Sequence, residues 1–204
     1  CPAVDGTRAL LEAAEKAGVQ KVVLTSSIAA MRFTRPPPAV LDESCWSDEQ
    51  LMREKLFESP PACYALAKTL QERAAWRAAE GGSFRLIVIN PALIIGPSLM
   101  PHLNFSLEAL VSLGEGRGSG LDSCRPGTLP DMYKGWVDVR EVSEAHVLAA
   151  ESPEAEGRYL LQSSVTHYAE IYDAMRRHPR FSGRPDLPID SKDGRRNAAA
   201  SRMD

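Results

Sequence analysis

Apolar and polar residues follow each other along the chain in two kinds of pattern. Two mainly apolar runs, at residues 22–25 and 84–90, have the length and composition of buried parallel strands. Shorter strands are predicted at residues 136–138 and 158–162. Apolar residues at helical spacing predict helices over residues 5–17, 64–80, 105–113, 139–151 and 168–177. Because strands alternate with helices, the pattern predicts an α/β fold, with a parallel sheet flanked by helices.

Glycine and proline mark where these elements end. Gly18 is predicted to stop the first helix, and Gly81-Gly82 the second. Residues 26–61 are predicted to be a loop, which closes at Pro60-Pro61. After Phe181 the apolar periodicity is lost, so residues 182–204 are predicted to form a flexible or divergent tail.

Composition limits the classes of function. With 204 residues, 44% of them hydrophobic, the chain is long enough for one globular domain with a real core. A net charge of −3 gives no basic surface for nucleic acid. No apolar run approaches the ~20 residues that cross a bilayer, and the first residues lack the pattern of a signal peptide. The four cysteines are scattered without metal-ligand spacing, so we expect reduced thiols, no metal and a cytoplasmic protein.

Tyr64 and Lys68 are the first candidates for chemistry. They stand four residues apart on a predicted helix, so their side chains share one face. A cation within about 4–6 Å lowers the pKa of a phenol from near 10 by roughly 1–3 units, which favours proton transfer. On residue types alone, a solvated helix face is the plain alternative.

Two adjacent serines follow the first apolar run. A hydroxyl there lies at the carboxyl end of a parallel strand, where open α/β sheets bind their ligands. Only one of Ser26 and Ser27 can point into such a site from a strand. On the residues alone, both serines stay candidates.

Five motifs occur in an order and at a spacing that together resemble a known family. They are Thr25-Ser26-Ser27, Asp42-Glu43-Ser44-Cys45-Trp46-Ser47-Asp48, Tyr64-Ala65-Leu66-Ala67-Lys68-Thr69-Leu70-Gln71-Glu72, Asn90-Pro91-Ala92-Leu93-Ile94-Ile95-Gly96-Pro97 and Trp136-Val137-Asp138-Val139-Arg140. On these residues the chain resembles the extended short-chain dehydrogenase/reductases, and among them the dihydroflavonol reductase and cinnamoyl-CoA reductase group. The resemblance covers residues 2–161.

The resemblance implies a Rossmann-like reductase with part of a smaller C-terminal substrate domain. Residues 1–181 would be the catalytic part, with substrate-pocket elements mainly from residues 97–135 and 157–181. The implied cofactor is NADP, with NAD as the alternative. The implied reaction reduces an aldehyde, ketone or acyl-CoA of phenylpropanoid or flavonoid type to an alcohol. The partner would be this small molecule, and the protein a monomer or weak dimer.

The resemblance also implies roles for particular residues. Tyr64 would be the general acid, Lys68 would lower its pKa and bind the nicotinamide ribose, and Ser27 would donate a hydrogen bond to the developing alkoxide. Other positions match cofactor contacts of the family, namely Pro91, Ala92, Leu93, Ile94 and Ser106. Arg32 matches a substrate-contact position. Ordinary strand packing, a helix cap and a surface arginine are the respective alternatives.

The sequence departs from the family at the cofactor cradle. A dinucleotide fold needs a glycine-rich turn between a strand and a helix, where backbone amides hold the pyrophosphate. The nearest match, at residues 114–119, ends in serine and follows a helical pattern. We therefore expect the cradle, and the residue that selects NADP or NAD, to lie upstream of Cys1, in an N-terminally truncated or partial sequence.

A second departure concerns the substrate. Cinnamoyl-CoA reductases carry Asn-Trp before the tyrosine, whereas this chain has Ala62-Cys63-Tyr64. The hypothesis is therefore a general carbonyl reductase. Two alternatives stay open: a sugar-nucleotide epimerase or sterol dehydrogenase on the same fold, and a truncated, non-catalytic remnant.

Overall fold

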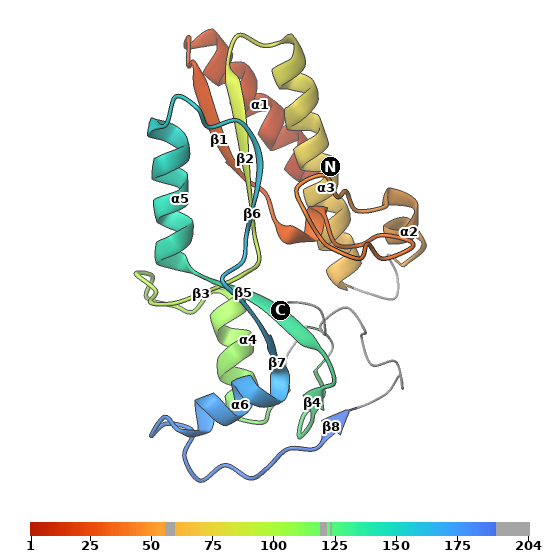
Figure 1. Cartoon of the computed structure of the whole chain (residues 1–204), viewed down its shortest axis with the longest axis vertical. Helices are drawn as coiled ribbons and strands as arrows, with labels where there is room; N and C mark the ends of the chain where they lie inside the picture. Colours follow the sequence, from red (N-terminus) through yellow and green to blue (C-terminus); the bar gives the residue numbers. More distant parts are fainter. Residues whose placement is uncertain (56–59, 119–121, 123, 191–204) are drawn as a thin grey trace. The chain divides into compact units, whose positions relative to one another are not determined.

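The protein divides into two compact units, described one at a time (Figure 1). The computed structural model describes residues 1–55, 60–118, 122 and 124–190. The first unit comprises Cys1–Ala92 and Arg140–Leu161, and the second Leu93–Val139 and Gln162–Asp204. The predicted α/β class is confirmed.

The sheet of the first unit is parallel and has β2 at its centre. Its strands are β1 (Lys21–Thr25), β2 (Arg85–Pro91) and β6 (Gly157–Leu161), in the order β1-β2-β6. Strand β2 is buried from its second residue to its last. This burial explains why its sequence is apolar without alternation, since helices cover both faces of a parallel sheet.

Side chains of β2 alternate between two cores. Leu86 and Val88 pack with α1 (Pro2–Lys16) and α3 (Pro60–Gly81) on one face of the sheet. Ile87 and Ile89 pack with α5 (Val139–Glu151) on the other (Figure 1). Each buried side chain of this size contributes about 1.5–3 kcal/mol. The same parity, even numbers towards α3 and odd numbers towards α5, governs the polar residues at the strand ends.

Lys21 fixes the start of β1 to the end of α5. Its Nζ donates to the carbonyl oxygens of Ala149, Ala150 and Ser152 at 3.3, 2.8 and 2.7 Å. The first two carbonyls belong to the last turn of α5 and the third follows it directly. At a helix C-terminus the dipole favours a cation, and the final carbonyls have no partner within the helix.

The helix ends follow the glycine and proline signals closely. Gly18 has φ +71°, and its N–H donates to the Glu15 carbonyl, so it ends α1 as predicted. Helix α3 begins at Pro60, four residues before the predicted start, because proline fits the first helical turn.

The predicted loop at residues 26–61 contains two short helices that the apolar pattern missed. They are the 3₁₀ turn η1 (Ile28–Ala30) and α2 (Glu49–Glu54). Side chains begin both, because Ser27 accepts from the Ala29 N–H and Asp48 from the Leu51 N–H. Both helices are shorter than the window over which helical periodicity can be recognised.

The second unit has its own strands and core. Strand β5 (Tyr133–Asp138) pairs in parallel with β3 (Leu93–Ile95) and antiparallel with β7 (Ser164–His167), while β4 (Leu129–Pro130) pairs with β8 (Ile189–Asp190). Helices α4 (Phe105–Gly114) and α6 (Tyr168–Arg176) complete it. Sequence patterning missed β3, β4, β7 and β8, all of four residues or fewer. Strand β8 lies in the predicted tail, of which residues 191–204 fall outside the described part of the chain.

Gly96 shows why the turn after β3 requires glycine. Its φ is +127°, and a Cβ at this position would lie 2.9 Å from Cγ1 of Val139 and 3.3 Å from Oδ1 of Asp138. Both the backbone conformation and the space therefore exclude a side chain.

We expect Gly96→Ala to lower the free energy of unfolding by about 1–3 kcal/mol, through backbone strain and the clash with Val139. Urea unfolding followed by circular dichroism measures this change. Gly6→Ala is the matched control: Gly6 lies inside α1 with no atom within 4 Å of its Cβ position, so alanine stabilises by up to about 1 kcal/mol. Equal effects of the two substitutions would contradict this account of Gly96.

Candidate active site

The carboxyl ends of β1 and β2 bring the predicted serines beside a conspicuous polar residue. The two strands are parallel, and Thr25 pairs with Ile89. Ser26 and Ser27 therefore leave β1 next to Asn90, which is fully buried near the end of β2. This edge of a parallel sheet is where open α/β folds bind ligands.

Strand parity separates the two serines. Ser26 has the parity of Val22 and Leu24, so its hydroxyl faces α3 and donates to Oε2 of the buried Glu72 at 2.6 Å. The Ser26 side chain is thus buried, and its hydroxyl hydrogen is used within the protein core. The Ser27 hydroxyl, by contrast, forms no bond to Glu72.

The Ser27 side chain caps η1. Its Oγ accepts a hydrogen bond from the Ala29 N–H at 3.1 Å, and its carbonyl accepts from Nδ2 of Asn90 at 3.2 Å. The Ser27 hydroxyl hydrogen finds no acceptor among the described residues. Held in this way, Ser27 can donate a hydrogen bond to a bound oxygen atom.

Tyr64, Lys68 and Glu72 form a stripe along α3 that turns from solvent into the core. Four residues advance about 40° beyond one full turn of an α-helix. The side chain of Tyr64 is accordingly 55% exposed, Lys68 is half-buried and Glu72 is fully buried. The same spacing therefore yields a solvent-facing phenol, a partly desolvated ammonium and a core carboxylate.

Lys68 reaches back to the strand that carries the serines. Its Nζ donates to the Thr25 carbonyl at 3.0 Å and to Oε1 of Gln71 at 2.5 Å. Burial lowers the pKa of the Lys68 ammonium from its ordinary value of 10.5, and the Glu72 carboxylate opposes that shift. An ammonium has three N–H donors, so one remains beyond these two bonds.

The three candidate catalytic residues belong to two elements, η1 and α3, that contact each other near the end of β1. Ala29 of η1 packs against Ala65 and Leu66, the neighbours of Tyr64, while Lys68 bonds to Thr25. The Tyr64 hydroxyl forms no hydrogen bond to the residues that the structure describes, Lys68 included. The helix that carries the phenol and the ammonium thus packs against the short turn that the Ser27 side chain caps.

The other predicted residues fall into both units. Pro91 ends β2 and Ala92 donates to the Leu161 carbonyl in the first unit, whereas Leu93 and Ile94 form β3 in the second. Ser106 lies in the first turn of α4, whose cap is Asn104 rather than the serine. In the first unit, the Arg32 guanidinium stacks on the Phe33 ring with its carbon 4.8 Å from the centroid.

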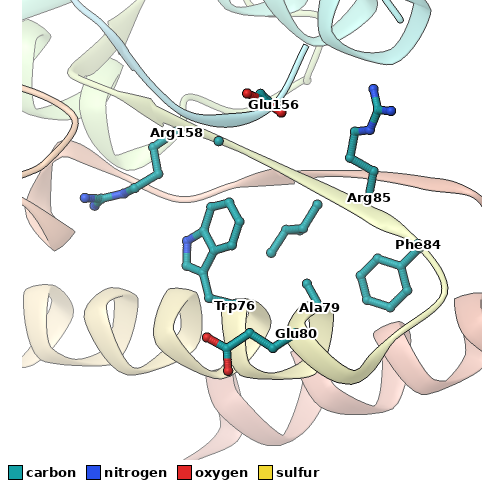
Figure 2. A pocket seen from close by; sticks show the side chains of 9 residues that line it. Trp76, Ala79, Glu80, Phe84, Arg85, Glu156 and Arg158 are labelled. Carbon is teal, nitrogen blue, oxygen red and sulfur yellow. The ribbon is translucent and has the colours of Figure 1, made fainter. Parts of the chain in front are cut away.

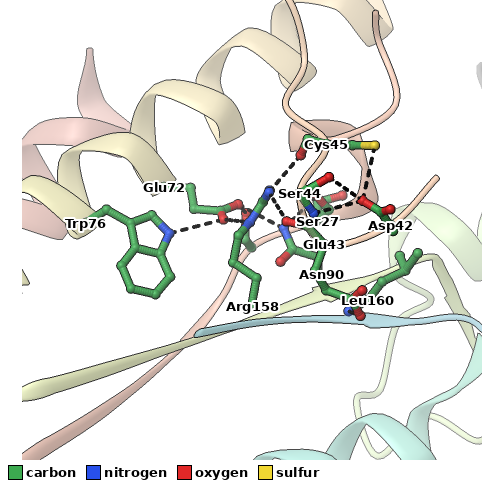
Figure 3. A network of polar contacts seen from close by, with 11 residues as sticks. Ser27, Asp42, Glu43, Ser44, Cys45, Glu72, Trp76, Asn90, Arg158 and Leu160 are labelled. Carbon is green, nitrogen blue, oxygen red and sulfur yellow. Dashed lines mark hydrogen bonds and ion pairs between the residues drawn. The ribbon is translucent and has the colours of Figure 1, made fainter. Parts of the chain in front are cut away.

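Sequence reasoning missed a buried polar cluster beneath the site, here called the Glu72 network (Figure 3). Its members are Glu72, Ser26, Asn90, Trp76 and Arg158. Two signals could have found part of it. Glu72 continues the spacing of Tyr64 and Lys68, and Asn90 is a polar residue at the end of an otherwise apolar strand. Arg158 is 86 residues from Glu72, and no local pattern links them.

His146 is a second residue that touches the strand carrying the serines. Its Nδ1 lies 2.7 Å from the Val142 carbonyl, which can only accept, so in the neutral ring Nδ1 carries the hydrogen. Nε2, 2.6 Å from Oγ1 of Thr25, then accepts from that hydroxyl. The neutral ring therefore fixes Thr25 from the α5 side, while Lys68 bonds to its carbonyl.

A groove of about 540 Å³ lies at the other end of the strands (Figure 2). Its lining includes Phe84, Arg85 and Gly157, where β2 and β6 begin, and Ala79 and Glu80 near the end of α3. Because Tyr64 and Ser27 lie at the opposite ends of these elements, the groove is separate from the candidate active site.

Within the described ranges, the side chains of His, Cys, Asp and Glu nowhere gather in groups of three or more that could hold a metal ion. Over the same residues, no helix combines the length and the apolar character needed to cross a membrane.

A model of the NAD dependent epimerase/dehydratase family matches residues 3–161 of the chain. Cinnamoyl-CoA reductase 1 of Arabidopsis thaliana is 38% identical over 176 residues, which is 85% of this chain and 47% of that protein. The chain thus spans about half the length of the relatives that it matches.

Solved structures of reductases have the same fold. Gre2 from Candida albicans, in complex with NADPH, matches with a TM-score of 0.72 and 29% identity, over 93% of this chain and 57% of that one. Vestitone reductase from alfalfa (Medicago sativa) matches with a TM-score of 0.72 and 27% identity, over 87% of this chain and 55% of that one. The parallel sheet and its helices are therefore those of Rossmann-fold reductases.

We expect Lys68→Met to change how stability depends on pH. Burial lowers the pKa of Lys68 in the folded protein, so between that lowered pKa and 10.5 the unfolded chain binds more protons than the folded one. The free energy of unfolding therefore rises with pH through this window, and the rise disappears in Lys68→Met. Urea unfolding at a series of alkaline pH values measures this pH dependence of the free energy of unfolding.

Lys16→Met, on the exposed face of α1, is the control and should keep the rise of stability with pH. If Lys68→Met keeps the rise as well, the Lys68 ammonium is not desolvated in the folded protein.

Proposed function

The chain belongs to the NAD dependent epimerase/dehydratase family, and from this membership we propose that it is the catalytic part of an NADP-dependent carbonyl reductase. The protein carrying it would reduce an aldehyde, ketone or acyl-CoA of phenylpropanoid or flavonoid type to an alcohol. The single observation that carries the proposal is the hydrogen bond of Lys68 to the end of β1, next to Ser27 and one helical turn after Tyr64.

The described residues fit the nicotinamide end of the cofactor. Lys68 offers its remaining N–H to a ribose hydroxyl, and Pro91, Ala92, Leu93, Ile94 and Ser106 are proposed to contact the cofactor. When bound, NADPH supplies the hydride that the carbonyl carbon accepts. The sequence has no G-x-G-x-x-G turn after a strand, so the pyrophosphate cradle is proposed to lie outside this chain.

Tyr64 is proposed to give its hydroxyl proton to the carbonyl oxygen as that oxygen becomes an alkoxide. The exposed phenol has no competing hydrogen bond within the described residues, so it is available to a substrate. A positioned general acid accelerates a reaction by about 10²–10⁴-fold.

Ser27 is proposed to stabilise the same oxygen. Its Oγ already accepts from the Ala29 N–H, so the hydroxyl hydrogen is directed elsewhere and can be donated to the developing alkoxide. Arg32, five residues further along, is proposed to contact the remainder of the substrate.

The names of the relatives favour reduction over epimerisation. Cinnamoyl-CoA reductase 1 and vestitone reductase are both named as reductases. Because the tyrosine of this chain lacks the preceding Asn-Trp of cinnamoyl-CoA reductases, the proposal covers carbonyl compounds generally.

Tyr64→Phe in the full-length protein should lower kcat for NADPH-dependent carbonyl reduction by about 10²–10⁴-fold, because it removes only the acidic hydroxyl. The assay follows NADPH absorbance with a panel of aromatic aldehydes, ketones and acyl-CoA esters, and includes a UDP-sugar. Tyr159→Phe is the matched control, since the Tyr159 hydroxyl only accepts from the Glu156 N–H. Turnover of the UDP-sugar without net NADPH consumption would replace reduction by epimerisation.

A titration of the isolated 204-residue chain with NADPH, followed by nicotinamide fluorescence, tests where the cradle lies. We expect no saturable binding, because the glycine-rich turn is not in this sequence. The full-length protein, which we expect to bind NADPH in the same assay, is the control. Saturable binding to the isolated chain would place a complete cofactor site within it.

A further inference from the structure

The loop at residues 42–48 is prominent in the sequence but supplies no group to the proposed reaction. Its role follows from what lies beneath it, the Glu72 network (Figure 3). Glu72 is fully buried, and each of its two carboxylate oxygens accepts two hydrogen bonds. Oε2 accepts from Ser26 and Asn90 at 2.6 and 2.8 Å, and Oε1 from Nε of Arg158 and Nε1 of Trp76 at 2.6 and 3.4 Å.

Arg158 is the counter-ion, and the loop holds it in place. Its side chain is only 8% exposed, and Nη1 donates to the carbonyls of Glu43 and Cys45, each at 2.7 Å. The guanidinium carbon lies 4.0 Å from the centroid of the Trp46 ring. Glu43 adds a second attachment, because its Oε1 accepts from the Leu160 N–H at 3.0 Å. The loop is thus fastened to β6 at Arg158 and Leu160.

The network reaches the backbone of Ser27 at two points. Asn90 donates through Nδ2 both to Glu72 and to the Ser27 carbonyl. Ser26, the preceding residue, gives its hydroxyl to the same carboxylate oxygen. The direction in which the Ser27 side chain leaves the end of β1 is therefore set by groups that Glu72 holds.

We propose that Glu72 and Arg158 are positioning residues for the active site, and that the loop at residues 42–46 keeps Arg158 against Glu72. This inference rests on the proposed function, because it concerns the placement of Ser27 for that chemistry. Apolar residues of similar volume commonly fill the space of a buried ion pair at equal or greater stability. An apolar pair cannot, however, direct the Ser26 hydroxyl and the Asn90 amide.

Four variants of the full-length protein test the proposal. Glu72→Leu with Arg158→Met replaces the pair by apolar side chains, Glu72→Gln removes the charge alone, and Arg158→Lys keeps the charge but loses the forked contacts to the loop. Arg73→Lys is the matched control. Arg73 also stacks on Trp46, with its guanidinium carbon at 5.2 Å, and pairs with Glu49, but it forms no bond to Glu72.

Two measurements are made on each variant: kcat and KM for carbonyl reduction, and the hydrogen exchange rate of the Ala29 amide, which donates to Oγ of Ser27. We expect the double variant to melt close to the parent temperature, with kcat about 10²-fold lower and KM for the carbonyl little changed. Ala29 exchange should be about tenfold faster, which is 1.4 kcal/mol of lost protection. Arg73→Lys should leave both readouts unchanged.

A folded double variant with parental kcat and parental Ala29 exchange would overturn the proposal and leave the pair as packing alone. If the double variant does not fold, Glu72→Gln and Arg158→Lys decide by the same two measurements. If the parent protein reduces no carbonyl compound in the panel, the proposed function fails separately, and Ala29 exchange still decides whether the pair positions Ser27.

Discussion

A carboxylate with no access to water has to be neutralised by a nearby cation and surrounded by hydrogen-bond donors. Glu72 has both, because Arg158 is its counter-ion and three further residues donate to its oxygens. Removing a charge from water costs several kcal/mol, which only good geometry recovers. Helix α3, the two strand ends, β6 and the loop at residues 42–48 all supply or receive contacts of this network. One buried carboxylate and its counter-ion therefore contact each of these elements of the first unit.

Successive side chains of a strand point to opposite faces of the sheet, and this alternation decides which helix each polar residue at the strand ends faces. Ser26 and Asn90 face α3 with the parity of Leu24 and Val88. Thr25, of opposite parity, bonds to His146 on α5. At the end of β1, Ser26 therefore contacts α3 and Thr25 contacts α5. Ser27 follows the strand, so its side chain can face a ligand.

Much of this arrangement could be predicted from the sequence, because it depends on local pattern. The apolar runs of β1 and β2, the helices flanking them and the shared stripe of Tyr64 and Lys68 all follow from spacing between near neighbours. The short helices η1 and α2 could not, since side-chain caps define them and no apolar repeat marks them. The ion pair of Glu72 and Arg158 could not either, because it joins residues that only the folded sheet brings together.

The attachment of β1 to α5 has a mechanical consequence. Lys21 fixes the first residue of the strand to the end of the helix, and Thr25 fixes the last residue to His146, one strand length or about 13 Å away. A strand that is hydrogen-bonded to a helix at both of its ends is constrained to move together with that helix. A displacement of α5 therefore requires β1, and the peptide that precedes the serines, either to follow it or to break these hydrogen bonds.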